Sequence, residues 1–242
     1  MPGSPTTTAL TRRNRAISQD NAPRLYLDFE GNKAGRLFLG CYRFAGETVR
    51  VVLDPDLAPA AEAKDLECMR PNAFVALVLQ ILKGNGAVIA AWSEHELEVI
   101  RAFGSLDDAA YDNVLARART WVNRHGLRDE YLPPARRRRT RPNPFIKDNW
   151  SLTRFTGWAL GEKPPRGYAK GKTTSRLGHV LDGLRRAGGY EGLTPGQKRK
   201  WGDLLEHNRW DVEVLERVST LLAQAPMLSE QGQVRDPASL PA

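Results

Sequence analysis

The sequence lacks the features that mark membrane-spanning, secreted and zinc-binding proteins. Its longest nearly unbroken apolar run, residues 73–82, is far shorter than the roughly 20 residues that a spanning helix needs. The first 20 residues contain basic side chains but no apolar core, so we expect no signal peptide. The 4 histidines are not paired at zinc-site spacing. We therefore expect a protein without a membrane partner.

Cysteine is scarce, and the phosphate-binding loop of NTPases is missing. The only cysteines, Cys41 and Cys68, are not spaced as metal ligands, and such sparse cysteine is typical of a reducing compartment. We expect two ordinary thiols and a cytoplasmic protein. Residues 167–173 (GYAKGKT) are one residue short of a P-loop, and no apolar strand precedes them. This favours a flexible basic loop over an NTPase.

Charge is abundant but unevenly placed. The net charge is +8, yet residues 136–200 contain 17 Lys and Arg against 4 Asp and Glu, which leaves −5 for the rest. A basic block can bind the phosphates of a nucleic acid, and aromatic side chains within the block can stack on its bases. Solubility features or linkers can have the same composition. The candidate nucleic-acid-binding residues are Arg136, Arg137, Arg138, Arg139, Lys170 and Lys172.

Composition divides the chain into one domain and two tails. Residues 1–22 are rich in Thr, Arg, Pro and Ser without periodicity, which predicts a disordered leader. Residues 225–242 predict a disordered tail for similar reasons. Residues 23–224 then form a single domain, since 41% apolar and 26% charged residues are typical of globular proteins.

Short apolar segments alternate with helical patterns along this domain. Three segments, 24–30, 36–44 and 48–53, are joined by short turns, which predicts an antiparallel three-strand meander. A helix, a buried strand and further helices follow, with an exposed loop over 128–148. Helices are expected over 72–83, 94–103, 106–123, 151–160, 175–187 and 195–222, and a strand over 87–91. The pattern predicts an α/β fold with a mixed sheet flanked by helices.

Two acidic residues share one side of the first expected strand. Apolar and polar residues alternate over residues 25–32 (LYLDFEGN), as in a strand with one buried face. Asp28 and Glu30 therefore point the same way, about 6–7 Å apart. Such carboxylates repel unless a positive charge lies between them, and divalent cations prefer carboxylate oxygens. We expect a metal site here, with two solvated acids as the alternative.

The last helix carries a second unusual acid. Its apolar stripe is interrupted by Asn208 and Asp211, and His207 lies one turn before Asp211. A carboxylate on a packed face is costly unless it is paired or bound to a metal. Two alternatives need no metal: Asp211 could form a salt bridge with an arginine, or the helix could be rotated so that Asp211 is exposed.

Glu96 is a third candidate ligand with an equally good structural explanation. It follows the expected strand 87–91 and begins a helix. Ser93 and Glu96 also fit the capping box S-x-x-E, in which the glutamate returns to the backbone of the first residue. One carboxylate oxygen could serve each role, so both interpretations stay open.

Together these motifs resemble the DEDD-type 3′–5′ exonucleases of the ribonuclease H-like superfamily. The similar elements are Asp28-x-Glu30 on a first strand, Glu96 after a later strand, and His207-Asn208-x-x-Asp211 on a C-terminal helix. The detail is most similar to the ribonuclease H-like domain of predicted RecB-type nucleases. The resemblance spans about residues 24–222 and implies a ribonuclease H-like fold.

The resemblance also implies a reaction and a partner. Asp28 would bridge two ions, Mg²⁺ or Mn²⁺, with Glu30, Glu96 and Asp211 completing the site, and His207 would act as general base. The expected activity is hydrolysis of DNA or RNA from a 3′ end, with a possible protein partner or larger nuclease complex.

Two positions depart from the family pattern. Glu96 stands where the superfamily usually has Asp, with Glu94 as an alternative, and His207 stands at the spacing of a tyrosine. These departures permit a second hypothesis, a nucleic-acid-binding domain with weakened or lost catalysis inside a larger complex. A protein-interaction module is a third.

Overall fold

A computed structural model of the chain describes residues 22–32, 34–132, 150–168 and 173–224. The expected tail, all but the last residue of the expected leader and most of the expected loop 128–148 lie outside these ranges. No helix in the described part of the chain is both long and apolar enough to cross a membrane.

One mixed β-sheet forms the centre of the molecule. Its strand order is β4-β3-β2-β1-β5-β6. β1, β2 and β3 form the expected antiparallel meander, while β5 runs parallel to β1, β6 to β5, and β4 to β3. The strands are β1 (Arg24–Gly31), β2 (Leu37–Phe44), β3 (Glu47–Val52), β4 (Glu67–Cys68), β5 (Val88–Ala91) and β6 (Tyr111–Asn113).

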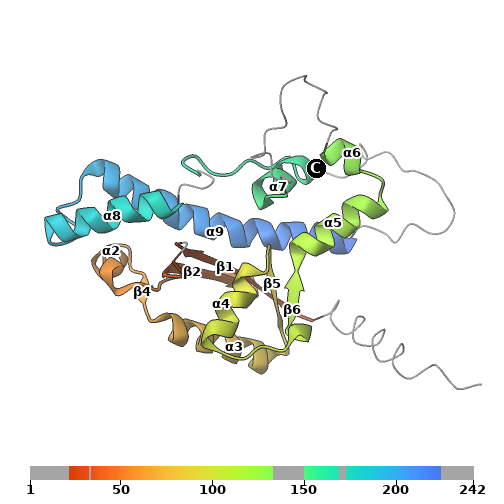
Figure 1. Ribbon diagram of the computed structural model, residues 1–242, viewed down its shortest axis with the longest axis horizontal. Helices are drawn as coiled ribbons and strands as arrows, with labels where there is room; N and C mark the ends of the chain where they lie inside the picture. The colour runs from red at the N-terminus through yellow and green to blue at the C-terminus, as the bar shows by residue number, and fades with distance from the viewer. Residues whose placement is uncertain (1–21, 33, 133–149, 169–172, 225–242) are drawn as a thin grey trace, which may run out of the picture.

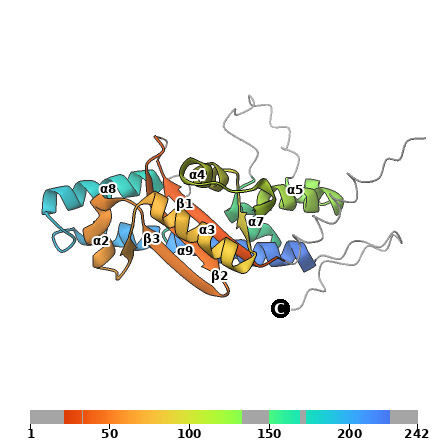
Figure 2. The same ribbon diagram turned by 90° about the horizontal axis from the view of Figure 1, so that it is seen from below.

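Helices cover both faces of this sheet (Figures 1 and 2). α3 and α4 lie on one face, and the long α9 crosses the other with α8 beside its first half and α5 and α7 beside its second. The helices are α2 (Ala58–Glu62), α3 (Pro71–Asn85), α4 (His95–Phe103), α5 (Val114–Arg124), α6 (Arg128–Tyr131), α7 (Leu152–Ala159), α8 (Thr173–Ala187) and α9 (Pro195–Gln224), with short 3₁₀ turns η1 (Pro55–Leu57) and η2 (Asp108–Ala110). The expected α/β fold with a mixed sheet is confirmed.

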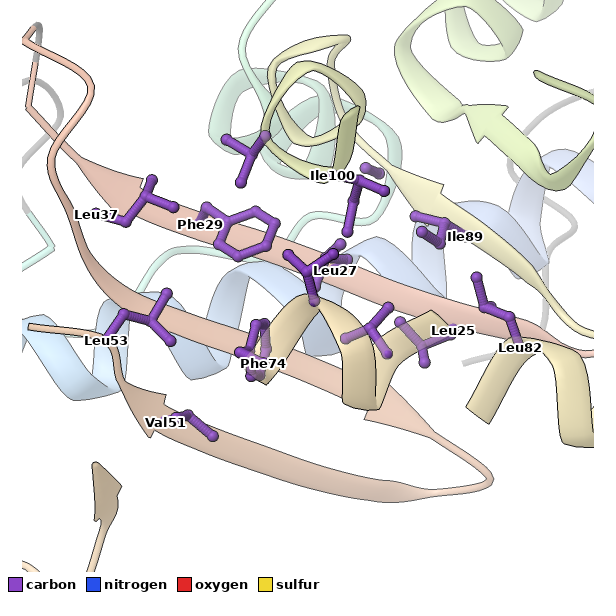
Figure 3. Packing of buried hydrophobic residues seen from close by; sticks show 14 of the residues in the cluster. Leu25, Leu27, Phe29, Leu37, Val51, Leu53, Phe74, Leu82, Ile89 and Ile100 are labelled. Atoms are coloured by element: carbon purple, nitrogen blue, oxygen red, sulfur yellow. The ribbon is translucent and has the colours of Figure 1, made fainter. Parts of the chain in front are cut away.

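The apolar face of β1 packs under α3 and α4. Leu25, Leu27 and Phe29 are buried in one cluster with side chains of both helices (Figure 3). Gly40 on β2 makes this packing possible, because a Cβ there would lie 2.7 Å from the Phe74 ring. Phe74 in turn meets Phe29 edge to face, with ring centroids 5.6 Å apart. The expected alternation of β1 therefore sets which residues face α3.

α9 joins two further apolar clusters. Its first half buries Trp201, Leu204 and Leu205 against leucines of α8 and residues of β2 and β3. Its second half buries Val214 and Val218 against the aromatic residues of α5, α6 and α7. The residues between these halves, 207–211, lie above the carboxyl end of β1.

The expected helix over 106–123 is wrong in its first part. Residues 108–110 form η2, residues 111–113 form β6 beside β5, and α5 begins at Val114. The Asn113 side chain accepts a hydrogen bond from the Ala116 amide and caps α5. A three-residue strand with the sequence YDN has no apolar alternation, so pairing to β5, not local pattern, makes it a strand. β4, α2 and α6 were not expected either.

Candidate metal centre

The polar face of β1 and the middle of α9 bring the expected site residues together. Asp28 and Glu30 point toward α9, which places His207 and Asp211 above them. The His207 Nε2 lies 3.2 Å from Glu30 Oε1 and 3.1 Å from Asp211 Oδ2. The possible ligand atoms of Glu30, His207 and Asp211 all lie within 4.8 Å of one another, close enough to share one cation.

Asn208 fixes the fourth member of the cluster. Its side-chain amide donates a hydrogen bond to Asp28 Oδ2. Asn208 is almost fully buried, with 1% of its surface exposed, so this bond forms away from competing water. Two neighbouring residues of α9 therefore hold β1, Asn208 through Asp28 and His207 through Glu30.

The two aspartates are unfavourable as anions in this setting. Burial raises the pKa of Asp28 well above its usual value, and the charges of Asp211, Glu30 and Glu96 raise it further. Burial is also the main cause that raises the pKa of Asp211, although hydrogen bonds from His207 and Tyr168 oppose it. A cation among these oxygens would remove this penalty.

His207 supplies a positive charge to the cluster. Burial alone would lower its pKa, but hydrogen bonds to Asp211 and Glu30 and their charges raise it to about 10. The ring is therefore an imidazolium near neutral pH, when it is hydrogen-bonded to both carboxylates. It contacts both Glu30 and Asp211 and offsets one of their two negative charges in the absence of a metal ion.

Glu96 lies near the cluster but is bonded elsewhere. It is 6% exposed, and Ser93 Oγ donates to its Oε2 over 3.1 Å. Burial raises its pKa to about 7, against hydrogen bonds from the Glu96 and Ser93 backbone and the Ser93 hydroxyl. Glu96 thus turns back onto Ser93, as in the capping interpretation, although the N-cap residue of α4 is Glu94 and no side chain caps the helix. The Glu96 charge still acts on Asp28. Among the described residues, the set close enough to share an ion includes neither Glu96 nor Asp28, so it contains two of the four expected ligands, Glu30 and Asp211.

Tyr168 is a site residue that the sequence analysis did not select. Its hydroxyl donates to Asp211 Oδ1 over 3.1 Å, and its ring stacks on the His207 imidazole with centroids 3.9 Å apart and planes 6° apart. It comes from the loop between α7 and α8, which the sequence identifies only as part of a basic segment. No spacing rule links residue 168 to residue 211, so only its aromatic character within a polar loop was visible.

The expected phosphate-binding residues cannot be placed. Arg136, Arg137, Arg138, Arg139, Lys170 and Lys172 lie outside the described residues. The first turn of α8 does reach the cluster, since Thr174 Oγ1 donates to the carbonyl oxygen of Gly31, the residue after Glu30.

Comparison with protein-family models, with curated proteins and with solved structures gave no match. The function is therefore argued from the residues of this chain.

Proposed function

We propose that the protein is a metal-dependent nuclease with a ribonuclease H-like domain, and that it hydrolyses DNA or RNA from the 3′ end. The observation that supports this most is the convergence of Asp28, Glu30, His207 and Asp211. These residues come from opposite ends of the domain, yet Glu30, His207 and Asp211 lie close enough to share one cation, and the charges of Asp211 and Glu30 act on Asp28 beside them.

The donor set fits a divalent cation of the Mg²⁺ or Mn²⁺ type. Such hard ions prefer carboxylate oxygens, and Glu30 lies here beside two aspartates whose charged forms are disfavoured by burial and by neighbouring acids. Asp28, Glu30 and Asp211 would hold the ions, and Glu96 would join them after release from Ser93. Bound ions would supply an activated water and stabilise the leaving oxygen of the phosphodiester.

The protein's own groups arrange this site. Asn208 holds Asp28, and Tyr168 holds Asp211, so both aspartates are oriented before any ligand arrives. His207 can serve as a base only after it loses the Nε2 proton shared with Glu30 and Asp211. Cations held by these carboxylates would weaken the hydrogen bonds that raise the pKa of His207, and neutral imidazole would then be accessible nearer working pH.

A specific observation favours the alternative, a nucleic-acid-binding domain with weakened or lost catalysis. The His207 imidazolium already lies against Glu30 and Asp211 and offsets one negative charge of the pair, and Glu96 already accepts a hydrogen bond from Ser93. A cluster satisfied in this way is stable without metal. In that case the basic residues would still bind nucleic acid, within a larger complex whose other subunits cleave it.

A cleavage assay separates the two functions. Single-stranded DNA and RNA labelled at the 5′ end are incubated with Mg²⁺, Mn²⁺ or EDTA, and the nuclease predicts a ladder of shortened products that EDTA abolishes. Asp28→Asn should abolish the ladder, whereas Asp182→Asn, the same change at an exposed residue of α8, should not. Binding without cleavage in Mn²⁺ would support the alternative and refute the nuclease.

A further inference from the structure

Tyr168 connects three separate elements at the acid cluster. Its hydroxyl is hydrogen-bonded to the Thr153 side chain of α7 and donates to Asp211 of α9. The stack on His207 and an edge-to-face contact with Trp210, at 5.2 Å between centroids, fix the plane of its ring. A tyrosine held by two hydrogen bonds and two ring contacts has one orientation.

The preceding glycine allows the loop to approach α9 this closely. Gly167 has a φ of +90°, and a Cβ at this position would lie 2.6 Å from the Asp203 carboxylate. Asp203 lies one turn before His207, which itself lies one turn before Asp211. The loop therefore runs along the same face of α9 as the acid cluster, and only glycine fits where it passes Asp203.

Both oxygens of Asp211 are consequently engaged. Oδ1 accepts from Tyr168, and Oδ2 is 3.1 Å from His207 Nε2. Without Tyr168, the carboxylate could rotate about its side-chain torsions, and ion binding would have to order it. Hydrogen bonds to ligating carboxylates set their direction and tune their affinity for a metal.

We propose that Tyr168 is a positioning residue for the metal centre. It holds the Asp211 carboxylate through its hydroxyl and the His207 ring through stacking, so that Asp211 and Glu30 face one ion. This inference rests on the proposed function, but it concerns a residue outside the motifs that suggested that function. It also assigns a role to the loop between α7 and α8, which is to deliver one side chain to the cluster.

Mn²⁺ affinity of the folded protein tests this role without relying on cleavage. We would titrate Mn²⁺ and follow the free ion by electron paramagnetic resonance, well below the melting temperature. Tyr168→Phe keeps the ring and removes the hydroxyl, so we expect affinity to fall about 10-fold to 100-fold, as for other groups that orient metal ligands. Gly167→Ala should weaken Mn²⁺ binding too, because it displaces an intact Tyr168.

Gly161→Ala is the matched control for the glycine variant. Gly161 also has a positive φ, +67°, but a Cβ there meets nothing within 4 Å. The Gly161→Ala variant should have a lower melting temperature in EDTA and an unchanged affinity for Mn²⁺.

The outcomes distinguish failure of the positioning role of Tyr168 from failure of the proposed nuclease function. If the unaltered protein binds Mn²⁺ and Tyr168→Phe binds it equally well, the positioning role is refuted while the proposed function stands. A lower melting temperature with unchanged affinity would likewise identify a merely structural tyrosine. If the unaltered protein binds no Mn²⁺, the proposed function fails and this inference fails with it.

Discussion

The two faces of β1 differ in character although they alternate along the same eight residues. On the side of α3 and α4, Leu25, Leu27 and Phe29 are fully apolar and at most 4% exposed. On the side of α9, Asp28 and Glu30 meet His207 and Asp211, and burial and repulsion disfavour the ionised aspartates.

This contrast separates stability from chemistry on a single strand. Each large apolar side chain buried on the first face contributes about 1.5–3 kcal/mol. The second face carries buried charges, which stabilise a fold only when they are paired. The first face therefore holds the strand in place, and the second uses that rigidity to keep acids close together. Substitutions on the apolar face should therefore lower stability and leave metal binding unchanged, whereas substitutions on the acidic face should do the reverse.

The largest expected effect is loss of activity in Asp211→Asn. Asn keeps the size and can still accept from Tyr168, but it removes one negative ligand. Cleavage in Mn²⁺ should fall about 100-fold or more, while the free energy of unfolding without metal changes by less than about 1 kcal/mol, since Glu30 still pairs with His207. Cleavage rates beside melts in EDTA measure both quantities. A destabilised but fully active variant would rule out Asp211 as a metal ligand.

The opposite signature is expected for Leu27→Ala. This change leaves a cavity among the residues of Figure 3, and it should lower the free energy of unfolding by about 2–5 kcal/mol. Mn²⁺ affinity of the molecules that remain folded should not change, because the acids lie on the other face. Urea titration and Mn²⁺ titration of one preparation test this. An equal loss of both would show that the two faces are not independent.

The smallest expected effect, about 1.4 kcal/mol for each pH unit, is a pH dependence of the metal-free protein. The pKa of His207 is about 10 when folded, against an ordinary 6.5, so the folded state binds an extra proton between these values. The protonated His207 therefore makes its full contribution to the free energy of unfolding below pH 6.5, and this contribution is lost as pH rises toward 10. Melts in EDTA across that range should show a decline that His207→Gln lacks. Parallel profiles for both proteins would contradict the raised pKa.

Periodicity was sufficient to predict much of the fold and the faces on which Asp28, Glu30 and Asp211 lie. The alternation over residues 25–32 placed Asp28 and Glu30 on one face of a strand, and the interrupted stripe placed Asn208 and Asp211 on the inner side of a helix. Both are local patterns whose period matches one secondary structure. The structure confirms these two placements.

Contacts made by tertiary pairing could not be predicted in this way. β6 is a strand only because β5 is beside it, and Tyr168 reaches Asp211 only because Gly167 passes close to α9. For Glu96, the sequence offered a cap or a metal ligand, and the choice depends on whether an ion is present. The positions of the arginines at 136–139 stay a prediction.

The length of α9 has a consequence for how the protein opens. This one continuous helix of 30 residues contributes side chains to one apolar cluster through Trp201 and to another through Val214 and Val218, with the acid cluster between them. Neither cluster can come apart far without bending or fraying the helix at His207 to Asp211. We therefore expect the two clusters to unfold as one cooperative unit, so that partly unfolded molecules with an intact acid cluster are not populated.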